Sequence, residues 1–126
     1  MSWNASPHAD LPIIDMCYSG VVTALELKES FYQTFKLIMS EGISRIRVDC
    51  TALGEGGHSI FDLYFLADLL AMHDLGVTLK EAIILPALPQ RHGNIEFWHI
   101  ACLNRGIRVQ LFTDHQAALE WLLEFA

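Results

Sequence analysis

Hydrophobic and polar residues alternate along this chain with two periods, one typical of strands and the other of helices. Residues 45–49 alternate with the period of two expected of a half-covered strand, whereas residues 27–38 place apolar side chains at helical spacing. Applied along the whole chain, this comparison predicts a strand followed by a helix, four times over. The strands are expected at residues 12–19, 43–49, 79–86 and 107–112, and the helices at about 23–40, 60–74, 94–105 and from 113 onward.

The chemistry of the turns supports these helix boundaries. Thr23 and Glu26 have the spacing of a capping box, and Gly42 is placed for a left-handed cap at the end of the same helix. Ser59 and Asp62 repeat the capping-box spacing at the start of the next helix, which Gly76 is expected to close.

The repeated strand–helix order predicts the fold class. Parallel strands joined by right-handed crossovers form a progressive sheet, and if the strand order never reverses, every helix lies on the same face. The sequence thus predicts an α/β fold, a right-handed β/α superhelix of four mainly parallel strands with helices on one face. Polar residues on one side of the strands fit an uncovered face. There we expect Arg45, Arg47 and Arg108, paired with carboxylates such as Asp15 or masked by the N-terminal arm or a second chain.

Composition indicates a single domain spanning residues 1–126, with residues 1–11 as an N-terminal arm. The net charge of −7 and the lack of a basic stripe argue against a nucleic-acid partner. No apolar stretch reaches the length of a membrane span, and the N-terminus does not resemble a signal peptide. Three cysteines without metal-ligand spacing suit a reducing cytosol, so a cytoplasmic location is expected.

The helix expected at 60–74 is apolar nearly all round, although a surface helix usually has a single apolar stripe. Three interpretations remain open: a protein–protein surface, a lid over an apolar ligand, or deep core. The first predicts a homodimer or another protein partner that contacts Phe61, Tyr64, Phe65 and Leu69.

Polar residues should gather at the carboxyl edge of the sheet, where α/β proteins commonly bind ligands. This candidate binding edge consists of Asp49, Thr51, His58, Arg91, His92, Asp114 and His115. Histidines and carboxylates there could act as a general base or bind a metal, but none of the spacings is a ligand signature. We therefore predict no catalytic residue, no metal and no cofactor. The glycine loop at 54–57 lacks the lysine of a phosphate-binding loop and is interpreted as a turn.

Three stretches resemble SpoIIAA-like proteins, relatives of the STAS domain of anti-sigma-factor antagonists. They are YSGVVTALEL at 18–27, RVDCTAL at 47–53 and FWHIACLNRGIRVQLFTDHQAALEWL at 97–122. The resemblance implies a right-handed β/α superhelix in a small bacterial protein. It also implies a possible phosphoacceptor at Ser59, which matches the position of the regulatory serine, although no glycine follows Ser59 as in that motif. The alternative for Ser59 is an ordinary helix cap.

Three functions follow from these observations. The first is a non-catalytic protein-binding or regulatory module. The second is a carrier of a lipid-like or other small apolar ligand, because lipid-transfer domains of the CRAL-TRIO type share the superhelical architecture. The third is a hydrolase that uses the histidines of the candidate binding edge. A closed apolar pocket would favour the carrier, and a flat apolar patch on the helix at 60–74 would favour the protein-binding module.

Overall fold

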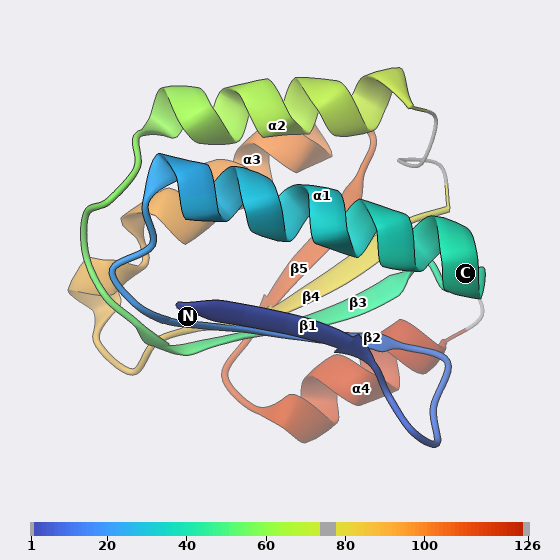
Figure 1. Cartoon of the computed structure of the whole chain (residues 1–126). Coiled ribbons are helices and arrows are strands. Elements are labelled where there is room, and N and C mark those ends of the chain that lie inside the picture. Colours follow the sequence, from blue (N-terminus) through green and yellow to red (C-terminus); the bar gives the residue numbers. More distant parts are fainter. Residues whose placement is uncertain (1, 74–77, 125–126) are drawn as a thin grey trace.

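The computed structural model describes residues 2–73 and 78–124, which form a five-stranded sheet and four α-helices (Figure 1). The sheet order follows the chain, β1-β2-β3-β4-β5. The strands are β1 (Trp3–Pro7), β2 (Ile14–Gly20), β3 (Arg45–Leu53), β4 (Lys80–Ile84) and β5 (Arg108–Phe112). The helices are α1 (Ala24–Glu41), α2 (Ile60–Met72), α3 (Gly93–Leu103) and α4 (His115–Leu123), with a short 3-10 helix η2 (Pro89–Arg91) before α3.

Strands β2 to β5 are parallel and never reverse their order, which confirms the predicted progressive β/α sheet. Strand β1 is a difference from the prediction, because residues expected in a loose arm form a strand antiparallel to β2. The sheet therefore has five strands instead of four. Trp3 pairs with Tyr18 at one end of this ladder, and Pro7 pairs with Ile14 at the other. A proline is tolerated there because β1 is an edge strand.

The predicted turn chemistry is present at α1. Thr23 accepts a hydrogen bond from the Glu26 N–H, and the Glu26 carboxylate accepts one from the Thr23 N–H. Gly42 closes the helix in the left-handed conformation, with φ of 67°. The expected end of the second helix near Asp74 and its cap at Gly76 lie outside the described residues.

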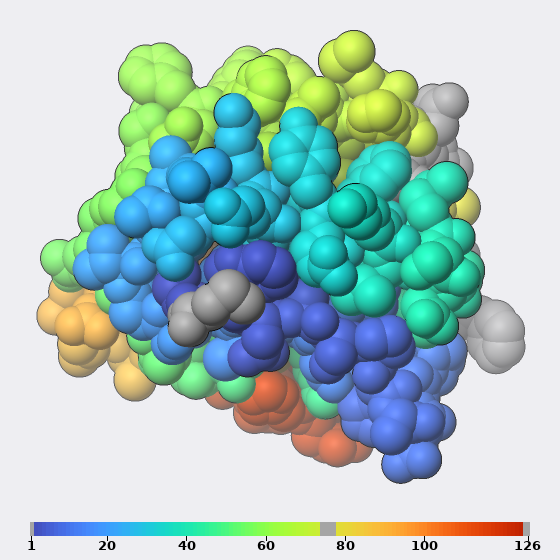
Figure 2. All heavy atoms as spheres, viewed as in Figure 1, coloured from blue at the N-terminus to red at the C-terminus, as the bar shows by residue number. Residues whose placement is uncertain are grey.

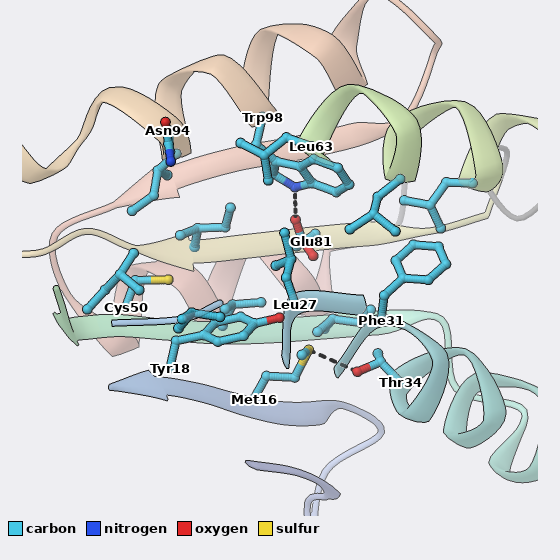
Figure 3. Close-up of a pocket in the computed structure, with 18 of the residues that line it drawn as sticks. Met16, Tyr18, Leu27, Phe31, Thr34, Cys50, Leu63, Glu81, Asn94 and Trp98 are labelled. Carbon is cyan, nitrogen blue, oxygen red and sulfur yellow. Dashed lines mark hydrogen bonds between the residues drawn. The ribbon is translucent and has the colours of Figure 1, made fainter. Parts of the chain in front are cut away.

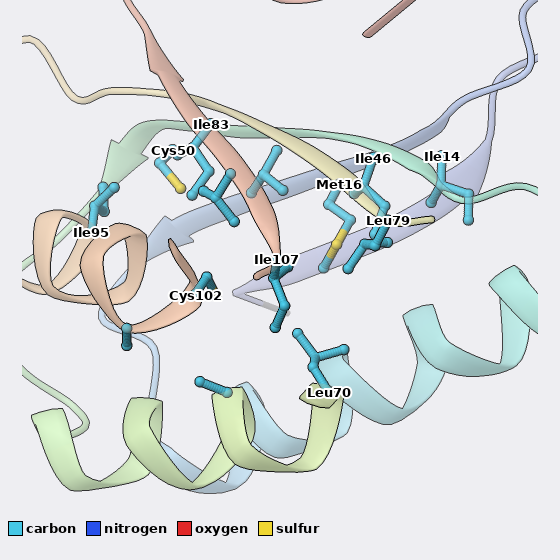
Figure 4. Packing of buried hydrophobic residues seen from close by; sticks show 14 of the residues in the cluster. Ile14, Met16, Ile46, Cys50, Leu70, Leu79, Ile83, Ile95, Cys102 and Ile107 are labelled. Atoms are coloured by element: carbon cyan, nitrogen blue, oxygen red, sulfur yellow. The ribbon is translucent and has the colours of Figure 1, made fainter. Parts of the chain in front are cut away.

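The main hydrophobic core lies between the sheet and helices α1, α2 and α3 (Figure 4). Alternation along β3 directs Ile46, Val48 and Cys50 into this core, and all three are buried. Figure 1 shows α1, α2 and α3 together on this side of the sheet.

The prediction that all helices share one face is wrong for α4, which packs against the opposite face (Figure 1). Ala118 and Leu122 of α4 pack against Ala82 and Ile84 of β4 and against Ile13, which immediately precedes β2. The handedness rule fixes the side of a helix only when that helix connects two parallel strands. Because α4 follows the last strand, it is free to cover the other face.

The polar residues on this second face hold the C-terminal end of α4. Lys80 is buried, and its Nζ donates to the carbonyl of Trp121 and lies 4.3 Å from the centre of the indole ring. Arg45 donates to the carbonyls of Leu122 and Glu124. Cationic groups stabilise a helix C-terminus because its last carbonyls have no partner within the helix. Arg45, which was expected on an uncovered face, therefore helps to attach α4 to the sheet.

The expected pairing of Arg47 with Asp15 is confirmed, with 2.9 Å between Arg47 Nε and Asp15 Oδ1. Arg108 lies on the same face, because it pairs with Lys80 in the sheet register, and it donates to the carbonyl of Thr78. Within the described residues, no helix is long and apolar enough to cross a membrane.

Candidate functional site

A cavity of about 120 Å³ lies inside the main core, between the sheet and helices α1, α2 and α3 (Figure 3). Its lining is predominantly apolar and comes from both layers. The sheet contributes residues such as Met16, Val48 and Ile83, and the helices contribute Leu27, Phe31, Leu63, Leu66 and Leu70. Cavities of this kind stay empty of water when they are apolar, and they can then take up small apolar molecules.

One carboxyl group, that of Glu81, faces this apolar space. Glu81 belongs to β4, and its side chain points toward α3, where Trp98 Nε1 donates to Oε1 at 2.6 Å (Figure 3). Burial raises the pKa of Glu81, and the hydrogen bond from Trp98 offsets part of that effect. The neutral acid is therefore favoured to a higher pH than in an exposed glutamate.

The hydroxyl groups and the imidazole in the lining bond to protein atoms. The hydroxyl groups of Tyr18 and Ser30 lie 2.6 Å apart, and Thr34 Oγ1 donates to the Ser30 carbonyl at 2.8 Å. His58 Nδ1 lies 2.8 Å from the Val22 carbonyl. Asn94 lines the cavity at the start of α3 (Figure 3).

The thiol of Cys50 also lines the cavity. Burial raises its pKa, and the nearby Asp49 carboxylate raises it further. A thiol with a raised pKa is a poor nucleophile, and Cys50 packs as a small side chain of the hydrophobic core.

The glycine-rich loop packs tightly against the turn between β2 and α1. Gly54 donates its N–H to the Gly20 carbonyl at 2.7 Å. A Cβ on Gly57 would lie 2.2 Å from the Val22 carbonyl oxygen, and its φ of 90° also disfavours any other residue. The glycines are thus explained by close backbone packing, as the interpretation as a turn predicts.

The candidate binding edge does not form one site. Asp49, Thr51 and His115 lie together on the α4 side of the sheet, where His115 Nε2 is 3.0 Å from Asp49 Oδ2. His58 lies on the other side, where it lines the cavity. The side chains of Arg91 and His92 reach backbone carbonyls, those of Leu53 and Pro86 respectively. Asp114 caps α4 by accepting from the Ala117 N–H.

The Asp49 cluster does not have the geometry of an activated hydroxyl. Thr51 donates both its N–H and its hydroxyl to Asp49 Oδ1, at 2.8 and 2.6 Å, while His115 contacts the other oxygen. These hydrogen bonds lower the pKa of Asp49 against the opposing effect of partial burial. A general base would have to accept the hydroxyl proton, and here the hydroxyl bonds to the carboxylate and not to the imidazole. No metal-binding cluster of His, Cys, Asp or Glu is found among the described residues.

Ser59 is exposed at the start of α2, where its capping partner is Asp62. Asp62 Oδ2 accepts from the Ser59 N–H at 2.8 Å and from the Ser59 hydroxyl at 3.2 Å. These bonds, with that to the backbone N–H the strongest, lower the pKa of Asp62. The geometry is that of a helix cap, and the role of Ser59 as a phosphoacceptor stays a prediction.

The outer side of α2 carries large apolar side chains in the layer that Figure 2 shows above α1. Phe61 is 80% exposed, and Tyr64 and Phe65 are each 50% exposed. Leu69, expected on the same surface, is partly buried. The helix thus has two apolar sides, because Leu63, Leu66 and Leu70 line the cavity on its inner side.

Glu81 and Trp98 are the functional residues that the sequence analysis missed. The available signal was a lone glutamate within the most continuously apolar strand, LKEAIILP at 79–86. A charged residue in a buried strand requires a partner. The identity of that partner, 17 residues away on α3, depends on tertiary packing.

Comparisons with known proteins identify the fold. No family model matches the chain, and no curated protein matches it. Among solved structures, it is similar to an uncharacterized protein from the DUF3478 family with a SpoIIAA-like fold, from Shewanella loihica PV-4. The two share 23% sequence identity with a TM-score of 0.57, over 95% of this chain and 91% of that chain. The chain therefore has a SpoIIAA-like fold, which confirms the fold expected from the resemblance.

Proposed function

We propose that this protein binds a small apolar ligand in the cavity between its sheet and helices α1, α2 and α3. The observation that supports this function is an apolar space of about 120 Å³ inside an otherwise well-packed core. Protein interiors normally contain few voids larger than a water molecule, because empty space forfeits dispersion contacts. A ligand that fills the space would restore those contacts.

The size of the cavity sets the size of the ligand. An engineered apolar cavity of about 150 Å³ in another protein binds benzene or xenon. We therefore expect a ligand of about one ring, or a short branched chain. Burying roughly 150–200 Å² of ring surface at about 25 cal/mol per Å² contributes about 4–5 kcal/mol. This corresponds to a dissociation constant of roughly 0.1–1 mM for an unsubstituted ring.

Titration with benzene, followed by methyl NMR, tests the proposal. The methyl signals of Leu66 and Ile83, which line the cavity, should shift and saturate in this concentration range. The methyl signals of Leu122, which is buried on the opposite face, should not move. Shifts confined to the methyl groups of exposed residues such as Leu25, or linear shifts without saturation, would contradict binding in the cavity.

A pair of matched variants separates filling of the cavity from general damage to the core. Val48 and Val109 are both 4% exposed in the same core cluster. Of these two valines, Val48 lines the cavity and Val109 does not. Val48→Leu places one more methylene in the cavity, where it takes up space that benzene would occupy. The loss of about one methylene's worth of ligand contact, roughly 0.8 kcal/mol, should weaken benzene binding about fourfold. Val109→Leu should leave binding unchanged while its overpacking lowers the free energy of unfolding by about 1 kcal/mol or more. Equal weakening by both variants would contradict the assignment of the cavity.

A second candidate function, a protein-binding module, is supported by the exposed outer side of α2. Phe61, Tyr64 and Phe65 form an aromatic surface, and Arg105 lies 4.3 Å from the centre of the Tyr64 ring. Exposed clusters of aromatic residues with arginine are typical of protein interfaces. We expect self-association, visible by light scattering as a mass that rises with concentration and that Phe61→Ser abolishes. A constant monomer mass across the concentration series would contradict the homodimer.

A further inference from the structure

We infer that the cavity selects a ligand with one hydrogen-bond-accepting oxygen, such as a small cyclic ketone, and that the Glu81 carboxylic acid donates to it. This inference rests on the proposed function and adds the chemical class of the ligand. It depends on the position of one carboxyl group within a predominantly apolar lining.

The hydrogen bond from Trp98 fixes the roles of the two Glu81 oxygens. An indole N–H can only donate, so Oε1 accepts. Within the described residues, Trp98 is the only hydrogen-bond partner of this carboxyl group. A protonated carboxyl therefore keeps its O–H on the other oxygen, available to a molecule in the cavity. Burial favours this neutral form, in agreement with the raised pKa of Glu81.

The surroundings favour a neutral ligand oxygen over a charged ligand group. No Lys or Arg is among the described lining residues, and Lys80, the neighbour of Glu81 in the chain, binds α4 on the opposite face. An anionic ligand would therefore be buried without a lysine or arginine to compensate its charge. An ammonium group would require Glu81 to ionise in an apolar site. A ketone or ether oxygen requires neither and accepts the available O–H.

The first experiment compares two probes of matched shape, cyclopentanone and methylcyclopentane, which have as many non-hydrogen atoms as benzene. For each protein, wild type and Glu81→Met, the affinity for the ketone is divided by the affinity for the hydrocarbon. Because the two probes have nearly the same shape, this ratio reports the contribution of the hydrogen bond to the ketone oxygen. The ratio of ketone affinity to hydrocarbon affinity should fall at least about tenfold in Glu81→Met. Glu81→Gln should keep it within about threefold, because the amide can accept from Trp98 and donate to the ketone.

Glu96→Met serves as the charge-matched control, since Glu96 is exposed on α3 and does not line the cavity among the described residues. It should leave the ratio unchanged. An unchanged ratio in Glu81→Met would overturn the inference while leaving the proposed function intact. If neither probe binds the wild-type protein, the proposed function itself fails. Tighter binding of cyclopentylammonium than of cyclopentanone would overturn the inference, because the preferred ligand would then be a cation and not a neutral oxygen acceptor.

An infrared measurement adds a test whose first comparison, cyclopentanone bound to the protein against cyclopentanone in a hydrocarbon solvent, needs only the wild-type protein. The carbonyl stretch of bound cyclopentanone should lie at lower frequency than in a hydrocarbon solvent, because a hydrogen bond weakens the C=O bond. Glu81→Gln should change this frequency, since an amide is a weaker donor than a carboxylic acid. A frequency equal to that in hydrocarbon, or one unaffected by Glu81→Gln, would show that the bound oxygen does not contact Glu81.

Discussion

Replacing Glu81 with glutamine should remove a pH-dependent cost that the buried acid imposes on stability. In the unfolded chain, a glutamate loses its proton near pH 4.5, whereas burial raises the pKa of Glu81 in the native state. Between these two values the native protein binds more protons than the unfolded chain. The free energy of unfolding therefore falls as pH rises, from the unfolded pKa until the native pKa is passed.

The size of this effect is set by one proton. While the native protein stays protonated and the unfolded chain does not, the slope is about 1.4 kcal/mol per pH unit. Glu81→Gln lacks this titration but keeps an oxygen that can accept from Trp98 Nε1. The stability of Glu81→Gln relative to wild type should thus increase as pH rises from 5, and then level off.

Urea unfolding followed by circular dichroism at several pH values between 5 and 8 measures this difference. Contributions from the other titrating groups of the chain are common to both proteins. Glu29→Gln provides a control with the same change in net charge at an exposed position, and its stability relative to wild type should vary little with pH. A stability difference between Glu81→Gln and wild type that is constant across the range would refute the assignment of a buried neutral acid.

Three further predictions concern the scaffold around the cavity and can be measured by the same urea unfolding. Asp62→Ala should lower the free energy of unfolding by about 1 kcal/mol, and Ser59→Ala by about half of that, because the backbone N–H of Ser59 supplies the shorter hydrogen bond to Asp62. A larger loss for Ser59→Ala than for Asp62→Ala would contradict this. Gly57→Ala should lower the free energy of unfolding by more than about 3 kcal/mol, because its Cβ would clash with the Val22 carbonyl. Gly56→Ala should lower it by only about 1–2 kcal/mol, because a Cβ at Gly56 meets no atoms within 4 Å. Similar losses for the two variants would contradict the clash at Gly57. Lys80→Met should lower the free energy of unfolding by about 1–3 kcal/mol and speed hydrogen exchange of the backbone amides selectively in α4, because Lys80 binds the C-terminal end of that helix. A uniform change in exchange along the chain would contradict the attachment of α4 by Lys80.

The parts of the fold that the sequence predicts correctly depend on local chemistry. The capping box at Thr23 and the left-handed cap at Gly42 involve residues within one turn of the helix they bound, so their spacing alone reveals them. The progressive order of β2 to β5 follows from the strand–helix repeat and the handedness of crossovers. Both kinds of prediction need no knowledge of distant contacts.

The parts that the sequence does not predict depend on where surfaces meet. Strand β1 has five residues, and it is held in the sheet by pairing with β2, which no local signal in residues 3–7 reveals. The side of the sheet chosen by α4 depends on Lys80 and Arg45, whose alternation is equally compatible with an uncovered face. The cavity is a volume left over when three helices pack on the sheet, and such a volume has no signature in the residue pattern.

The candidate site shows the same division. Asp49 and His115 were expected near each other at one edge, and the structure places them in contact at 3.0 Å. His58, expected with them, lies on the other side of the sheet, because it follows the glycine loop that leads into α2. Sequence reasoning can assign residues to an edge, but the side of the sheet depends on loop packing.

A crystal structure determined under xenon pressure tests the central claim most directly. If the cavity binds small apolar ligands, we expect an anomalous-scattering peak for xenon between the sheet and helices α1, α2 and α3, in van der Waals contact with Leu66 and Ile83. The same peak should be missing from crystals of a variant whose cavity is filled by Val48→Phe. An absence of xenon from this cavity in the wild-type crystal, with the surrounding side chains packed together and no space left, would contradict the account.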